Sequence, residues 1–319
     1  MAKVILGLGS SHGPPTEVPP EKWDVFREKD ENDPRYDFQA LLNAAPADVA
    51  DRITPEKWRS YYASAQAGIE ALSAKLADAK PDVIVIVGND QREMFQPENT
   101  PMFAIYSGES FKSVPRGDLK TLPRYAVEYT KNQDFDRKYR VDQRFARHIT
   151  GAMVGDGIDL AVCASMPEDR GMGHGTMFVF ERLLSREADI PVVPLLINTF
   201  YPPNQAPIRR CYEFGQSLRR AIDSYGKDLR VAVICSGGLS HFLLETELDS
   251  ALLEAMRTKD VEGLLGLPEE KMEIGTSELR NWIATAGALE REKMTIVDYF
   301  EAPRTLANTG LAFAFTYWE

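Results

Sequence analysis

Cysteine and histidine are both scarce in this chain. Its 319 residues include three cysteines and four histidines. Cys163, Cys211 and Cys235 lie far apart and lack the short spacings of zinc-binding motifs. We interpret them as small buried residues of a protein in a reducing compartment, which argues against a disulfide-linked scaffold.

Long apolar runs and an excess of basic residues are also missing. No stretch approaches the roughly 18 to 20 apolar residues that a transmembrane helix requires. The chain opens on an apolar, strand-like run from Met1 to Gly7 without a charged leader, so we expect a cytoplasmic protein. Its 37 Lys and Arg residues are outnumbered by 48 Asp and Glu residues, a net charge of -11. Such acidity disfavours binding to nucleic acid or to anionic membranes.

Five short runs rich in Val and Ile predict buried strands. They hardly alternate between apolar and polar residues, which is typical of strands covered on both faces. The runs are residues 4–8, 83–87, 160–163, 192–197 and 231–235. Amphipathic stretches separate several of them. We therefore predict an α/β protein with three layers, α/β/α, around a central mixed or mostly parallel sheet.

Two helices can be placed from the sequence. Thr54-Pro55-Glu56 is typical of a helix start, with a capping hydroxyl, a first-turn proline and an acidic residue. Apolar residues then recur at helical spacing, and they are Trp58, Tyr62, Ala65, Ile69, Leu72 and Leu76. A second helix is predicted from about residue 207 to 225, with an apolar face made of Ile208, Cys211, Leu218 and Ile222.

Two regions break the alternating pattern. Residues 13–53 are rich in Pro, Asp and Glu, and we interpret them as a long irregular excursion that serves as a lid or a binding surface. Residues 108–142 are polar and predict a second surface excursion with one short helix. Because no internal repeat or low-complexity linker is present, we expect residues 1–319 to form a single domain.

Three of the four histidines lie in loops punctuated by glycine. His12 follows the first predicted strand, His174 lies within a glycine cluster, and His241 follows the strand that ends at Cys235. Ligands of α/β proteins bind at the carboxyl ends of strands, so these positions favour a functional role. His148 belongs to a predicted helix and is interpreted as structural.

The separated motifs together resemble the class III extradiol ring-cleavage dioxygenases, the superfamily of the protocatechuate 4,5-dioxygenase β subunit. The resemblance spans nearly the whole chain. Its motifs are Ser10-Ser11-His12, Gly171 to Gly175, Asn198-Thr199-Phe200-Tyr201-Pro202-Pro203 with Arg210-Cys211, Gly237-Gly238-Leu239-Ser240-His241, Ser277-Glu278-Leu279 with Trp282 and Gly287-Ala288-Leu289, and Ala307-Asn308-Thr309-Gly310-Leu311.

The resemblance implies a ferrous ion held by two histidines and one carboxylate. It assigns His12 and Glu278 as ligands, but Gln91 stands where the family has its second histidine ligand. A glutamine oxygen can coordinate iron as a weaker, neutral donor. Asp90 or Glu93 is an alternative source of the missing ligand.

The resemblance also implies how the other residues act. His241 would be the acid/base that moves a phenolic proton, because the pKa of histidine lies near neutrality. His174 would donate a hydrogen bond to the substrate or to dioxygen. Tyr201 and Arg92 are predicted to contact the substrate, Arg92 through a carboxylate.

Two functions remain open. The first is an Fe(II)-dependent dioxygenase that uses O2 to open the ring of a catechol-like, aminophenol-like or hydroxylated aromatic acid substrate by extradiol cleavage. The alternative is a catalytically altered relative that serves as a metal-binding or partner-binding module, for which Gln91 is the main support. Relatives commonly assemble as dimers, so we expect a homo-oligomer.

Overall fold

The computed structural model describes residues 1–114, 122–130, 135 and 137–319, and nine strands within these residues form one large sheet. Their order is β10-β11-β1-β8-β2-β7-β3-β6, and β9 pairs with β11. The strands of the sheet are β1 (Ala2–Ser10), β2 (Val83–Asn89), β3 (Phe103–Tyr106), β6 (Ala161–Cys163), β7 (Val192–Ile197), β8 (Leu229–Ser236), β9 (His241–Leu243), β10 (Met294–Pro303) and β11 (Thr309–Trp318).

The middle of the sheet is parallel and its flanks are mixed. Strands β1, β8, β2 and β7 run parallel to one another, whereas β11 is antiparallel to β1 and β3 is antiparallel to β7. The predicted mixed sheet is therefore confirmed. The carboxyl ends of the four parallel strands share one edge, where the loops that follow them meet.

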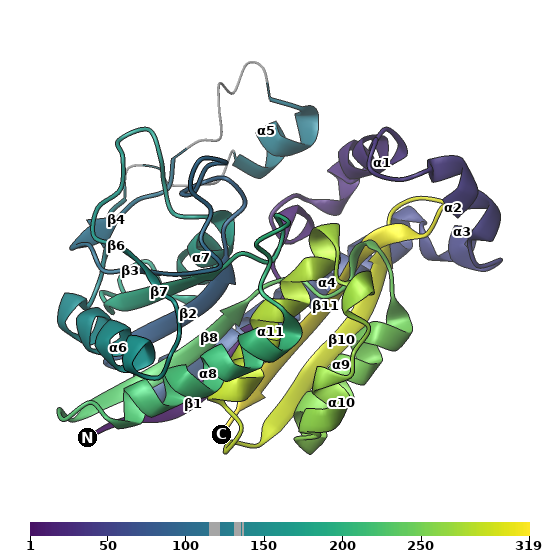
Figure 1. The fold of residues 1–319 in the computed structure, drawn as a ribbon. Coiled ribbons are helices and arrows are strands. Elements are labelled where there is room, and N and C mark those ends of the chain that lie inside the picture. Colours follow the sequence, from purple (N-terminus) through teal and green to yellow (C-terminus); the bar gives the residue numbers. More distant parts are fainter. Residues whose placement is uncertain (115–121, 131–134, 136) are drawn as a thin grey trace.

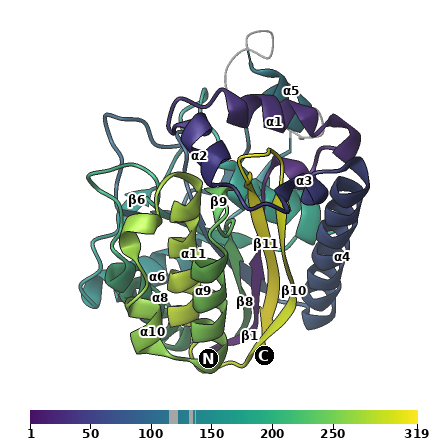
Figure 2. The ribbon, with the colours of Figure 1, turned by 90° about the vertical axis from the view of Figure 1, so that its right-hand side faces the viewer.

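Helices cover both faces of the sheet and make three layers, as predicted (Figure 1, Figure 2). Helices α4 and α7 pack on one face, and α6, α8, α9 and α11 pack on the other. The helices are α1 (Asp24–Glu31), α2 (Phe38–Ala44), α3 (Val49–Arg52), α4 (Pro55–Ala79), α5 (Arg124–Thr130), α6 (Gln143–Gly155), α7 (His174–Phe178), α8 (Ile208–Asp223), α9 (Thr246–Thr258), α10 (Val261–Leu265) and α11 (Leu279–Ala288).

The longest of these helices, α4, begins where the sequence predicts. The Thr54 side chain accepts a hydrogen bond from the Lys57 backbone N–H, and Pro55 is the first helical residue. The predicted apolar stripe faces the sheet and is buried except for Tyr62, which is half-buried. The second predicted helix is α8, with its four predicted apolar residues buried. No helix among the described residues has both the length and the apolar character needed to cross a membrane.

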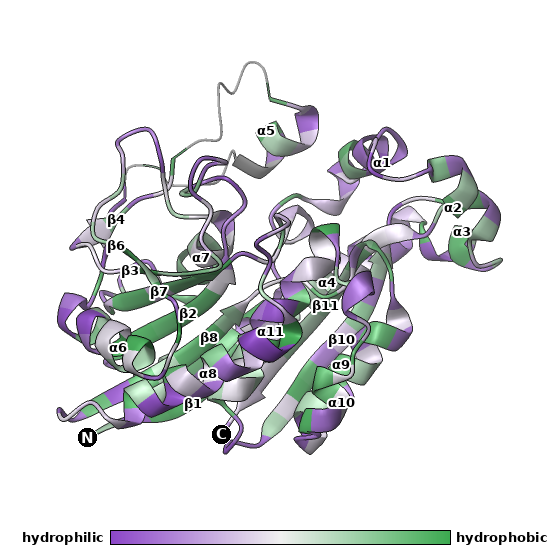
Figure 3. Ribbon diagram, viewed as in Figure 1, coloured by the Kyte–Doolittle hydropathy of each residue, from purple (hydrophilic) through white to green (hydrophobic). Residues whose placement is uncertain are grey.

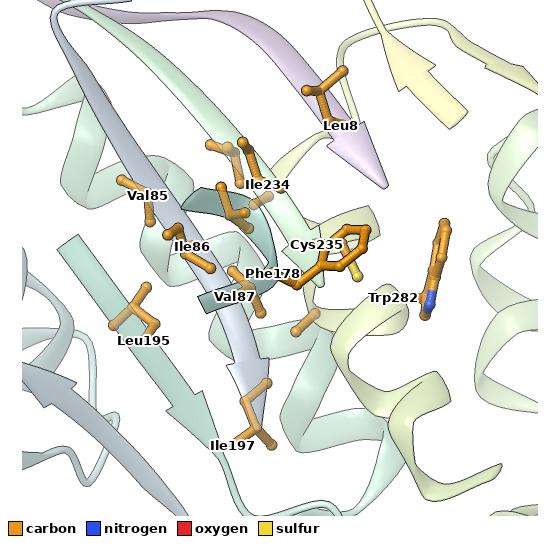
Figure 4. Packing of buried hydrophobic residues seen from close by; sticks show 14 of the residues in the cluster. Leu8, Val85, Ile86, Val87, Phe178, Leu195, Ile197, Ile234, Cys235 and Trp282 are labelled. Atoms are coloured by element: carbon orange, nitrogen blue, oxygen red, sulfur yellow. The ribbon is translucent and has the colours of Figure 1, made fainter. Parts of the chain in front are cut away.

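The core lies on both sides of the parallel strands. All residues of β2 and β7 are buried, and Figure 3 colours these strands as hydrophobic. Figure 4 shows side chains of β1, β2, β7 and β8 packed around Phe178 of α7 and Trp282 of α11. Burial of such large apolar side chains stabilises the fold by roughly 1.5 to 3 kcal/mol each, so the layers hold the strand ends in fixed positions.

One predicted strand differs from the other four. The run at residues 160–163 forms the short strand β6 at the edge of the sheet, and its Val162 is 52% exposed. The expectation that this run is covered on both faces is therefore wrong. Its apolar sequence cannot by itself distinguish an edge strand from a central one, because position in the sheet depends on pairing with β3.

The excursion at residues 13–53 is more ordered than the sequence predicts. It contains the short helices α1, α2 and α3, and Trp23 and Phe26 anchor it in the core. The Trp23 indole N–H donates a hydrogen bond to the Val18 carbonyl, and its ring packs 6.0 Å from that of Trp58. Trp23 thus packs the segment against α4.

The excursion at residues 108–142 contains the predicted short helix as α5. It also contains two short strands, β4 (Ser110–Phe111) and β5 (Tyr139–Arg140), which pair with each other. The predicted excursion includes residues 115–121, 131–134 and 136, which lie outside the described residues. Helices α1 and α5 lie beyond the carboxyl ends of the strands (Figure 1).

Candidate functional site

A cavity of about 350 Å³ opens where the loops of the sheet edge meet the two excursions. It is lined by His12, Gly13, Pro14, Pro15, Phe26, Lys29, Arg35, Gln91, Glu93, Ser113, Val114, Leu122, Pro123, Tyr125, Ala126, Met172, His174, Phe200, His241, Phe242, Gly275, Glu278, Arg304 and Leu311. Five predicted site residues are among them, namely His12, Gln91, His174, His241 and Glu278. The fold therefore brings together residues that are far apart in the sequence.

His12 follows β1 and is only 4% exposed. Its Nδ1 lies 3.0 Å from Ser236 Oγ, and the Ser236 hydroxyl donates to the Gly175 carbonyl at 2.6 Å. Ser236 must therefore accept from the Nδ1–H of His12, which leaves a lone pair on Nε2. Burial, together with the nearby His174, lowers the pKa of His12 well below its ordinary value, so the ring is neutral.

The Nε2 atom of His12 has no hydrogen-bond partner among the described residues. Glu278 Oε2 lies 3.5 Å from it. A buried nitrogen lone pair without a partner is unfavourable in a folded protein, and a bound cation would satisfy it. Its position beside a carboxylate therefore fits a metal ion.

Glu278 ends a short 3-10 helix (Ile274–Glu278) and directly precedes α11. Its carboxylate is buried and accepts three hydrogen bonds. Oε2 accepts from the Gly238 backbone N–H at 2.6 Å, and Oε1 accepts from Asn89 Nδ2 at 3.2 Å and Gln91 Nε2 at 2.9 Å. These donors fix both oxygens at the sheet edge.

His174 is the first residue of α7 and is paired with Glu93. Its Nδ1 lies 2.6 Å from Glu93 Oε1, and its ring meets that of His12 edge-on with 4.9 Å between centroids. One ligand atom from each of His12, His174 and Glu278 lies within 4.8 Å of the others. We call these three residues the ligand cluster. Two imidazoles and a carboxylate are typical ligands of non-haem ferrous iron.

Asp90 and Glu93, the alternatives to Gln91 as the missing ligand, have different surroundings. Asp90 accepts backbone N–H bonds from Arg92, Met94 and Phe95, which caps the loop after β2. Burial raises the pKa of Asp90 to about 6. Glu93 instead lines the cavity and accepts from the Gln91 backbone N–H at 2.5 Å.

His241 begins β9 and turns one ring nitrogen toward the backbone. Its Nδ1–H donates to the Leu239 carbonyl at 2.7 Å, which leaves the Nε2 lone pair available. Burial lowers the pKa of His241 from 6.5, so the neutral ring can accept a proton at pH 7. The ring packs against Gly275, where a Cβ atom would lie 2.2 Å from Cδ2 of His241.

Three cationic side chains also line the cavity, and we call Lys29, Arg35 and Arg304 the cationic cluster. Asp30 pairs with Lys29 at 3.3 Å and with Arg304 at 2.8 Å, while Asp33 pairs with Lys29 at 3.4 Å and with Arg35. Neither aspartate is among the residues that line the cavity. Three cations next to two carboxylates leave an excess of positive charge on this wall.

Arg92 and Tyr201 contact each other instead of lining the cavity described above. The Arg92 guanidinium carbon lies 3.9 Å from the centroid of the Tyr201 ring. Phe200, the residue before Tyr201, lines the cavity instead. Their predicted contact with substrate stays a prediction.

Sequence reasoning missed several residues of the site. Asn89 and Ser236 end strands β2 and β8, and their polarity after buried apolar runs was an available signal. The cationic cluster has no local signature, because Arg304 meets Asp30 across 274 residues of chain.

The fold and the cavity define an α/β protein with a candidate metal site at the carboxyl edge of its parallel strands. Residues 46–313 match the family of the catalytic LigB subunit of aromatic ring-opening dioxygenase. The chain belongs to this family, which confirms the resemblance to the class III extradiol dioxygenases.

Curated relatives match shorter parts of the chain. Gallate dioxygenase of Pseudomonas putida is 39% identical over 98 residues, 30% of this chain and 27% of that protein. A 2,3-dihydroxyphenylpropionate/2,3-dihydroxicinnamic acid 1,2-dioxygenase of a Mycobacterium species is 36% identical over 174 residues, 54% of this chain and 50% of the relative. Its counterpart in Azotobacter vinelandii is 28% identical over 165 residues, which are 51% of this chain and 50% of that protein. The aligned segments thus span about a quarter to a half of these relatives.

Proposed function

We propose that this protein is an Fe(II)-dependent dioxygenase that opens a hydroxylated aromatic ring by extradiol cleavage with O2. The observation that carries the proposal is the arrangement in one cavity of the Glu278 carboxylate, the neutral His241 ring and His12 Nε2, which has no hydrogen-bond partner in the described part of the chain. The donor atoms fit a ferrous ion, and the third ring fits proton transfer. Family membership supports the same reaction.

His12 and Glu278 would hold the ferrous ion, and the resemblance assigns the third position to Gln91. When bound, this ion supplies a common binding site for the diol oxygens and dioxygen and relays electron density between them. The protein keeps both ligands in place through Ser236 behind His12 and Asn89 behind Glu278. Such partners orient a ligand before the metal arrives.

His241 would accept the phenolic proton on Nε2 and return it to the oxygen released by ring opening. The hydrogen bond from Nδ1–H to the Leu239 carbonyl fixes the tautomer that leaves Nε2 as acceptor. The resemblance gives His174 a hydrogen bond to substrate or dioxygen.

The substrate class we favour is the hydroxylated aromatic acid over the catechol-like and aminophenol-like alternatives. The diol would face the ligand cluster, and a carboxylate on the ring would face the cationic cluster. Lys29 Nζ and the Arg35 guanidinium carbon lie 3.7 Å and 4.4 Å from the centroid of the Phe242 ring, directly after His241 in the chain. This contact connects the excess positive charge to the catalytic loop.

The second candidate function is a metal-binding or partner-binding module that has lost oxygen chemistry. Gln91 favours it, because an amide replaces an imidazole at a ligand position of the family. Anaerobic loading with Fe(II) followed by a panel of aromatic diols separates the two functions. Oxygen uptake with loss of ring absorbance and a yellow ring-opened product supports the dioxygenase. Iron binding without oxygen uptake on any diol would instead support the module.

We also propose that the protein acts in the cytoplasm as a homo-oligomer, most simply a dimer. The three cysteines, which are few, widely spaced and free, support the location. Size-exclusion chromatography with light scattering tests the assembly, and a monomer across the micromolar range would contradict it.

A further inference from the structure

Position 91 is where this chain departs from the pattern it resembles. The structure places the amide nitrogen of Gln91 as a donor, 2.9 Å from Glu278 Oε1. Turning the amide around would bring its oxygen against a carboxylate oxygen, and neither atom can donate. Asn89 Nδ2 donates to the same Glu278 oxygen at 3.2 Å. The contacts of Gln91 are therefore those of a residue that holds a ligand.

His174 has the contacts expected of a ligand itself. It lines the cavity beside His12, and its ligand atom lies within 4.8 Å of those of His12 and Glu278. The two imidazoles meet edge-on, with 4.9 Å between their centroids, so the rings are adjacent without being stacked.

Glu93 fixes the ring of His174 from behind. Its Oε1 lies 2.6 Å from Nδ1 of His174, while its Oε2 accepts from the Gln91 backbone N–H at 2.5 Å. An ionised carboxylate only accepts, so Nδ1 carries the proton and Nε2 keeps a lone pair. Metal-binding histidines commonly donate their second ring N–H to a carboxylate, which orients the ring and raises its basicity. Ser236 gives His12 the matching support.

We propose that His174 is the third metal ligand of this protein, that Glu93 is its positioning residue, and that Gln91 positions Glu278. The inference rests on the proposed function, because it takes the site to bind ferrous iron. Two imidazoles and one carboxylate are then retained although position 91 carries an amide. The third ligand comes from the start of α7 instead of the loop after β2.

The test is ferrous-ion binding to the full-length protein, measured by anaerobic calorimetry. His174→Ala should weaken iron binding by more than the roughly 100-fold that loss of a supporting residue costs. Glu93→Gln should weaken it by roughly 10- to 100-fold, and Gln91→Ala by less than His174→Ala. His148→Ala is the matched control, since this histidine bonds the Ala221 carbonyl and Ser224 Oγ between α6 and the end of α8 and is not among the residues that line the cavity.

X-ray absorption at the iron edge counts the imidazoles directly. Multiple scattering should indicate two bound imidazole rings in the wild type, in Gln91→Ala and in Glu93→Gln, and one in His174→Ala. His174→Gln keeps a polar side chain at the start of α7 and should also show one ring, so the count does not depend on the folding of the alanine variant.

One imidazole in the wild-type protein, or an unchanged affinity in both His174 variants, would overturn the assignment while leaving an iron site in place. A loss of iron in Gln91→Ala as large as that in His174→Ala would return the ligand role to Gln91. A wild-type protein that binds no ferrous ion would overturn the proposed function itself.

Discussion

The two charged clusters of the cavity are built in different ways. In the ligand cluster, His12 and Glu278 are 4% and 1% exposed, and each is fixed by partners at the ends of parallel strands. In the cationic cluster, Lys29 and Arg35 come from the 13–53 excursion, and the Arg35 side chain is 35% exposed. Its members hold one another through Asp30 and Asp33. We therefore propose that the sheet edge provides the chemistry and that the excursion contributes to substrate selection.

The largest effect is expected at the ligand cluster. Glu278→Gln removes the buried negative charge beside His12 and should weaken iron binding by more than roughly 100-fold, with oxygen uptake lost in parallel. Iron per protein after anaerobic loading and desalting measures it. Glu292→Gln is a control, because this carboxylate accepts from Arg219 away from the cavity. Full iron content in Glu278→Gln would contradict the role of the ligand cluster in binding iron.

The next largest effect is expected at His241. His241→Gln should retain iron but lower turnover by roughly 10²- to 10⁴-fold, the usual contribution of a general acid/base. Because the pKa of His241 is lowered from 6.5, wild-type kcat/KM should stay level near pH 7 and fall only as the pH drops through the lowered value. The variant should lack this acid limb. An iron-free variant would show that His241 is a ligand.

A smaller, substrate-dependent effect is expected at the cationic cluster. Lys29→Met should raise KM for 3,4-dihydroxybenzoate by roughly 10- to 100-fold, because a charge-assisted hydrogen bond is worth about 1.5 to 3 kcal/mol. KM for the neutral 3,4-dihydroxybenzamide should hardly change. Lys22→Met is the matched control, because Lys22 also belongs to the 13–53 excursion and its exposed side chain pairs with Glu128. Equal changes for acid and amide would remove the cationic cluster from substrate recognition.

The smallest effect is expected at the Arg92–Tyr201 pair. Arg92→Ala removes a cation–π contact worth about 0.5 to 1 kcal/mol, so melting temperature should fall slightly and KM for the acid should change less than about fivefold. Steady-state kinetics on the same acid and amide measure it. A rise in KM confined to the acid and as large as in Lys29→Met would move the carboxylate site to Arg92, as the sequence predicted.

Parts of the fold that depend on local pattern could be predicted. The strand at Val192–Ile197 and the helix from Pro55 match their predicted limits, because continuous Val and Ile runs and capping residues act over a few neighbours. The antiparallel pair β10 and β11 was not predicted. Strand β10 is the outer strand of this pair. It is only partly buried, and its sequence is less uniformly apolar than those of the predicted strands.

The candidate site could be predicted residue by residue but not contact by contact. His12, His174, His241 and Glu278 were selected from loops and motifs, and the fold does bring them to one cavity. The partner of His174 was not predicted, because Glu93 lies 81 residues away in the chain.

The sequence by itself determined the central strands, the helices α4 and α8 and the inventory of chemical groups at the strand ends, since these follow from local propensity and periodicity. Only the tertiary structure decided which atoms face each other. One hydrogen bond fixes the tautomer of each of His12, His174 and His241. The bonds from His12 Nδ1 to Ser236 Oγ and from His174 Nδ1 to Glu93 Oε1 join atoms that only tertiary packing brings within 3.0 Å. The same packing turned the Gln91 amide toward Glu278.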